Sequence, residues 1–81
     1  MGQLDSESAR AARELVRAAV ARHLELPAGD DDELDLSSFV VIALAEELET
    51  LGGFVVTARE LLPENFSTVA KLTAFVERKR A

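Results

Sequence analysis

Apolar residues recur at helical spacing in three stretches of this chain, and each stretch lies between residues that begin or end helices. The first stretch predicts a helix that Ser6 or Ser8 caps and that Pro27 and Gly29 end. Alanine, leucine and arginine dominate it, and all three favour helix intrinsically. Its expected apolar face consists of Ala12, Leu15, Val16, Ala19, Val20, His23 and Leu24.

The second stretch predicts a helix from Ser38 to about Leu51, preceded by a long acidic loop. Ser37 stands where an N-cap is needed, since its hydroxyl can accept a hydrogen bond from the first turn. The pair Gly52-Gly53 is expected to end this helix. The face toward the core should contain Val41, Leu44, Ala45, Leu48 and Leu51.

The remaining segment predicts a connector, a short helix and a last long helix. Phe54–Val56 has no strand to pair with, so we expect a buried connector. Thr57 and Glu60 have the spacing of a capping box, and Pro63 should end the short helix that they open. Ser67 is the expected cap of the last helix, whose apolar positions are Val69, Leu72, Phe75 and Val76. The chain therefore predicts an all-α bundle of three main helices plus one short helix, with a long loop between the first and second helices.

Length and charge limit the number of domains and the kinds of partner that the chain can have. The 81 residues make one domain, in which we expect residues 1–7 to be flexible and residues 79–81 to fray. Residues 30–64 hold ten acidic residues and one base, Arg59, within a chain of net charge −6. Such a segment repels nucleic acid and attracts a basic protein surface. No apolar run is long enough to span a membrane and no secretory signal is present, so we expect a cytoplasmic monomer.

The polar residues of the chain could form two kinds of site. Ser38 as a catalytic nucleophile would need a positioned base, but the only histidine is His23, on the apolar side of the first helix, so we expect no enzyme. The acidic loop departs from the spacing of an EF-hand, which leaves a solvated loop or weak divalent binding. The carboxylates available for such binding are Asp30, Asp31, Asp32 and Asp35.

Three apolar residues beside Ser38 are not needed for the predicted core. Phe39, Val40 and Ala43 should turn toward solvent or the rim of the bundle. An apolar patch at a helix start, beside an exposed serine, is typical of a docking site. Glu46 and Glu47 follow on the same helix and would steer a partner of opposite charge.

These features together resemble the acyl and peptidyl carrier proteins. Ser38-Phe39 is similar to the S-L of that family's D-S-L motif, with Ser37 where aspartate is usual. The stretch ALAEELETLGGFVV resembles the family's A-L-E-E-E-F-G-I-x-I segment. LLPENFSTVAKLTAFVE resembles its P-E-N-F-x-T-V segment, found especially in stand-alone carriers related to D-alanyl carrier proteins. The resemblance extends from Ser8 to Val76.

The resemblance implies a role for each serine. Ser38 would carry 4′-phosphopantetheine, which a phosphopantetheinyl transferase takes from coenzyme A, and Ser37 would cap the helix beside it. The thiol of the arm would hold an acyl or aminoacyl group as a thioester. A loading enzyme and a downstream transferase or synthase, in fatty acid, polyketide or nonribosomal peptide biosynthesis, would be the partners. The alternative is an unmodified helical interaction module with a carrier-like fold.

Overall fold

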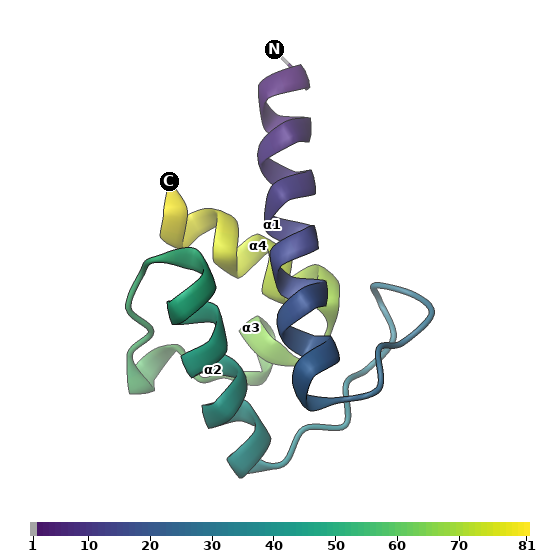
Figure 1. Cartoon of the computed structure of the whole chain (residues 1–81), viewed down its shortest axis with the longest axis vertical. Coiled ribbons are helices and arrows are strands. Elements are labelled where there is room, and N and C mark those ends of the chain that lie inside the picture. The colour runs from purple at the N-terminus through teal and green to yellow at the C-terminus, as the bar shows by residue number, and fades with distance from the viewer. Residues whose placement is uncertain (1) are drawn as a thin grey trace.

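The computed structural model describes residues 2–81, and in them it has four α-helices and one 3-10 turn (Figure 1). The elements in chain order are α1 (Gly2–His23), α2 (Ser38–Gly52), η1 (Ala58–Glu60), α3 (Pro63–Phe66) and α4 (Val69–Arg80). The predicted all-α bundle with a long first loop is confirmed. None of these helices combines the length and the apolar character needed to cross a membrane.

Helix α1 is longer than predicted at its start. It begins at Gly2, so Ser6 and Ser8 both lie within the helix rather than at its start, and the segment expected to be flexible is helical from Gly2 onward. Met1 lies outside the described residues. Nothing between Gly2 and His23 breaks a helix, because the stretch has no proline and no further glycine. The N-terminal part of α1 projects past the other helices (Figure 1), and burial in the core begins at Ala12.

Helix α2 follows the predicted bounds closely. Ser37 has extended backbone angles and caps the helix, and Gly53 ends it in the left-handed region with φ 74°, which favours glycine. Leu44, Ala45 and Leu48 are buried as predicted, whereas Leu51 is exposed, so its assignment to the core face was wrong.

The segment after α2 departs from prediction in two ways. Phe54 and Val56 pack against the core, but Val55 between them is exposed, so the connector is only partly buried. The short helix predicted before Pro63 is only the turn η1, and Pro63 begins α3 rather than ending a helix. Proline suits the first helical position because its missing N–H would have no partner there.

Helix α4 begins one residue later than expected. Its N-cap is Thr68, whose hydroxyl accepts a hydrogen bond from the Lys71 N–H at 3.0 Å, so the predicted cap at Ser67 was wrong. All four predicted apolar positions of α4 are buried. Near its C-terminus Lys79 pairs with Glu60 at 2.9 Å, which ties down the first of the three residues expected to fray.

The helices share one core. Helix α1 packs against both α2 and α4, and α3 packs against α4, where the Phe66 and Phe75 rings lie 5.6 Å apart. The long loop is fastened to the α3–α4 junction by backbone hydrogen bonds. The Leu34 N–H donates to the Ser67 carbonyl at 2.8 Å, and the Ala70 N–H donates to the Asp30 carbonyl at 2.9 Å. The loop therefore brings Leu34 and Leu36 to the start of α2, next to α3.

Candidate functional site

Ser37 and Ser38 have different local roles, as the sequence predicted for the cap. The Ser37 hydroxyl accepts a hydrogen bond from the Val40 N–H at 3.2 Å, and the Ser37 carbonyl accepts from the Val41 N–H at 2.9 Å. Ser38 is the first residue of α2, and it is exposed. Its hydroxyl is committed to no hydrogen bond within residues 2–81. Of the two serines, Ser38 therefore has the hydroxyl available for reaction.

The start of α2 also offers an electropositive end. The N–H groups of Ser38 and Phe39 have no acceptor among the described residues, and the first turn contains no acidic side chain. Unpaired N–H groups and the helix dipole together favour a phosphate at such a position. A phosphodiester on Ser38 would therefore meet a favourable field.

An apolar cavity adjoins Ser38. A volume of about 230 Å³ is lined by Ser38, Val41, Ile42 and Leu61. A second cavity of about 240 Å³ shares Val41 and Leu61 with the first, so the two lie side by side. The second is lined by Leu34, Leu36, Val41, Leu61, Leu62, Pro63, Phe66 and Ser67. We call the two together the α2–α3 groove. No charged side chain lines it among the residues that the structure describes.

The predicted docking residues are exposed to different degrees. Phe39 is 79% exposed, but Val40 and Ala43 are half-buried. Ile42, which the sequence reasoning passed over, is 51% exposed and lines the groove beside Ser38. Helical spacing contains the signal for it, because a residue four positions after Ser38 lies on the same face whereas Val40, two positions after it, does not.

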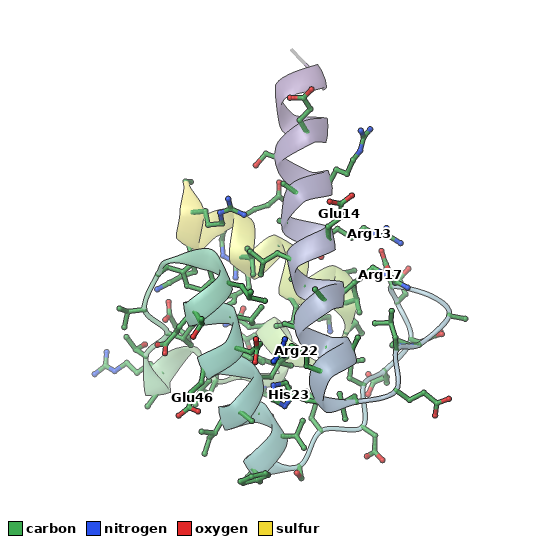
Figure 2. All side chains as sticks on the ribbon, viewed as in Figure 1. Arg13, Glu14, Arg17, Arg22, His23 and Glu46 are labelled. Atoms are coloured by element: carbon green, nitrogen blue, oxygen red, sulfur yellow. The ribbon has the colours of Figure 1, made fainter. Side chains whose placement is uncertain are left out.

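The two acids expected to steer a partner also differ. Glu46 is exposed, and Figure 2 shows it on the side of α2 that faces away from α1. Glu47 lies against α1 instead, with its carboxylate oxygens 3.4 Å from Arg22 Nε and 3.4 Å from His23 Nε2. Figure 2 shows Arg22 and His23 directed toward α2. Glu47 and His23 thus belong to the α1–α2 contact, and His23 faces a carboxylate rather than a serine.

The acidic loop does not assemble a metal site in the described part of the chain, where no three carboxylate or imidazole side chains gather. Asp30 is held by Arg13 and Arg17, and the Asp32 carboxylate accepts from the Gly29 N–H at 3.0 Å. Asp31 and Asp35 are exposed. Two of the four candidate ligands therefore already have partners within the protein.

Comparisons of the chain with family models, with curated proteins and with solved structures found no match.

Proposed function

We propose that this chain is an acyl carrier protein. It would carry an acyl group as a thioester on a 4′-phosphopantetheine arm attached to Ser38, and present that group to biosynthetic enzymes. The observation that carries the proposal is the exposed Ser38 hydroxyl at a capped helix start, beside an apolar groove. The resemblance of Ser38-Phe39 and the two longer segments to the carrier family points the same way.

The attachment needs no catalytic group from this chain. On a transferase, the Ser38 oxygen attacks the phosphorus of coenzyme A that bears the pantetheine. The new P–O bond forms as the bond to the adenosine bisphosphate half breaks, and the transferase takes the serine proton. The chain itself contributes an accessible hydroxyl, a firm cap from Ser37 and two free N–H groups facing the phosphate position. The arm supplies a thiol, which holds the cargo as a thioester.

The lining of the α2–α3 groove favours an acyl cargo over an aminoacyl one. Its walls are apolar except for Ser38 and Ser67, and no carboxylate lines it in the described part of the chain. An ammonium group placed there would lose its hydration without gaining a counter-ion, which is costly. An acyl chain would instead gain free energy by burying apolar surface.

Partner enzymes would dock on Phe39 and Ile42, which flank Ser38 on α2. Both are large, apolar and exposed, with Glu46 one turn further along the helix. A partner pocket that covers the two apolar side chains would supply affinity, and a basic rim facing Glu46 would guide the approach. Val40 and Ala43 contribute less, since they are half-buried.

The test is enzymatic modification followed by intact mass measurement. With coenzyme A, Mg²⁺ and a broad-specificity transferase, we expect the chain to gain one phosphopantetheine. Ser38→Ala should gain none, whereas the matched variant Ser37→Ala, which keeps the Ser38 hydroxyl, should still be modified. An unmodified wild-type chain would contradict the proposal and favour an unmodified interaction module that uses Phe39 and Ile42. Modification of Ser38→Ala would place the attachment site elsewhere.

A further inference from the structure

A separate groove lies between α1 and α4. A cavity of about 500 Å³ is lined by Ala9, Arg10, Arg13, Asp30, Ala70 and Thr73, and we call it the α1–α4 groove. It shares no lining residue with the two cavities of the α2–α3 groove. Figure 2 shows Arg13 on the side of α1 that faces the long loop, whereas α2, which begins at Ser38, lies on the other side of α1. The proposed attachment at Ser38 therefore does not use this groove.

Positive charge exceeds negative charge in the α1–α4 groove. Arg10 and Arg13 line it from adjacent turns of α1, and Asp30 is the only acid in its lining among the residues that the structure describes. The charge of Asp30 is already compensated, because its carboxylate accepts hydrogen bonds from both Arg13 and Arg17. Arg10 is exposed and forms no ion pair with any described side chain. The groove therefore favours an anionic ligand, in a chain whose net charge is −6.

Arg13 has N–H groups left for such a ligand. A guanidinium group has five N–H donors. Asp30 accepts from Nε of Arg13 and, at 3.3 Å, from Nη2, which leaves Nη1 without an acceptor among the described residues. The contact with Asp30 also restrains the Arg13 side chain, so a ligand would remove less rotamer freedom on binding.

The spacing of the two arginines and the size of the other side chains indicate the kind of anion. Residues three apart on a helix have Cβ atoms about 5–6 Å apart, a separation that one phosphate group can bridge. A phosphate monoester has three strong acceptor oxygens and nearly two negative charges, whereas a single arginine fork can occupy both oxygens of a carboxylate. The remaining lining residues, Ala9, Ala70 and Thr73, are small and present methyl groups, which leaves room for an organic body.

We propose that the α1–α4 groove binds a small phosphate monoester. The phosphate lies between Arg10 and Arg13 and accepts hydrogen bonds from both guanidinium groups, and the organic body covers Ala9 and Ala70. This site goes beyond the proposed carrier function and does not depend on it, because Ser38 lines neither the groove nor its rim.

The test is a titration of the full chain followed by the amide shifts in nuclear magnetic resonance spectra. The probes are phenyl phosphate, inorganic phosphate and benzoate, with ionic strength held constant by sodium chloride. We expect saturable shifts in α1 around Ala9–Arg13 and in α4 around Ala70. Phenyl phosphate should bind at least about three-fold more tightly than inorganic phosphate, which lacks the organic body, and than benzoate, which lacks the third oxygen and the second charge.

Two variants of equal charge change locate the site. Arg10→Gln should weaken phenyl phosphate binding by about five-fold or more, because a charge-assisted pair is lost. It should melt like the wild type, since Arg10 is exposed. Arg10→Lys, which keeps the charge but not the planar fork, should recover only part of the affinity. Arg59→Gln removes an exposed charge on η1, outside the groove, and should change the affinity by less than about two-fold.

Several outcomes would overturn the site. Shifts that do not saturate, or equal weakening by Arg10→Gln and Arg59→Gln, would mean general attraction of anions to surface arginines. Benzoate or inorganic phosphate binding as tightly as phenyl phosphate would contradict the assigned ligand class. The result is independent of the mass measurement on Ser38: if Ser38 takes no arm but the titration behaves as expected, the carrier function is wrong and the phosphate site stands.

Discussion

Asp30 holds the long loop against α1 and α4. Its carboxylate accepts hydrogen bonds from Arg13 and from Arg17, the latter at 2.9 Å, and its carbonyl accepts from the Ala70 N–H. Figure 2 shows both arginines on the side of α1 that faces the loop. The hydrogen bond from Arg13 lowers the pKa of Asp30 most, Arg17 lowers it further, and desolvation opposes both. The folded protein thus favours the charged carboxylate more than the unfolded chain does.

Asp30→Asn should therefore change how stability depends on pH. A lowered pKa in the folded state stabilises the protein above the unfolded pKa, and this stabilisation is lost as pH falls through the folded pKa. The wild type should be more stable than Asp30→Asn at about pH 7, and the difference should shrink as the pH falls below 3.8, the ordinary pKa of the carboxyl group, and through the lowered pKa of the folded state. Urea unfolding at several pH values measures it. Asp31→Asn, whose exposed side chain makes no ion pair within residues 2–81, is the control and should follow the wild type at about pH 7. A difference for Asp30→Asn that stays constant with pH would contradict the argument.

At the scale of single residues, the sequence predicts roles that depend on neighbours in the chain and misses contacts between distant segments. The roles of Ser37 and Ser38 follow from a local rule, because a cap and the residue after it are set within one helical turn. The contacts of Asp30 and Glu47 do not follow from a local rule, because each joins segments that only the fold brings together. From the charge pattern alone we predicted a solvated acidic loop, whereas Asp30 in that loop forms ion pairs with α1. The pattern also predicted that Glu47 would steer a partner, whereas Glu47 lies beside Arg22 of α1.

At the scale of elements, the start of α4 has two neighbouring residues that could each cap the helix. Ser67 and Thr68 can both cap a helix, and the sequence does not decide between them. The backbone does. Ser67 has helical angles, φ −75° and ψ −20°, because it ends α3, while Thr68 is extended at φ −141° and ψ 162°. The four-residue α3 that imposes this was itself not predicted, since Pro63 was expected to stop a helix rather than begin one.

The two hydroxyls should therefore respond differently to removal. Thr68→Ala takes away the acceptor for the Lys71 N–H, and we expect it to lower the free energy of unfolding by about 0.5–2 kcal/mol. Ser67→Ala in the unloaded protein should lower it by nothing, or raise it, because an unpartnered buried hydroxyl is lost. Chemical denaturation of both variants measures this. Equal losses would mean that the cap of α4 is shared between the two residues.

The α2–α3 groove could not be predicted from any one element. Its walls come from the long loop, from α2 and from the η1–α3 segment, and the loop reaches it only because its backbone is fastened to Ser67 and Ala70. Apolar spacing identified the helices and most of the buried residues, since these depend on local periodicity. It gave no sign that Leu61 and Val41 would line a cavity beside Ser38.

At the scale of the whole molecule, negative charge and exposed apolar surface meet on α2. Many acids of residues 30–64 are engaged within the protein. Asp30 and Glu47 pair with arginines, Glu60 pairs with Lys79, and Glu49 accepts from the Val56 N–H at 2.7 Å. Glu46 remains exposed on α2 near Phe39 and Ile42. Glu46 should therefore contribute long-range electrostatic attraction to a partner, and Phe39 and Ile42 should contribute short-range apolar contact. The two contributions should be separable.

Measuring the rate of Ser38 modification at different ionic strengths should separate the electrostatic contribution from the apolar one. Glu46→Gln removes one exposed charge, so it should slow transferase modification of Ser38 by about two-fold at low salt and have no effect near 1 M salt, where the Debye length is about 3 Å. Phe39→Ala should slow modification by about five-fold or more at every salt concentration, because an apolar contact is not screened. Both variants should keep the wild-type free energy of unfolding within about 0.5 kcal/mol, since both side chains are exposed.

Leu44→Ala is the contrasting control. Leu44 is fully buried, so this variant should lose about 2–5 kcal/mol of stability. At a temperature where it remains folded, its rate of modification should equal that of the wild type, because Leu44 offers no surface to a partner. Steady-state rates across a salt series, with denaturant melts of each variant, measure all three changes. If the Phe39→Ala defect disappeared at high salt, or if Phe39→Ala were as unstable as Leu44→Ala, Phe39 would not be a docking residue. The exposed apolar surface beside Ser38 would then need another explanation.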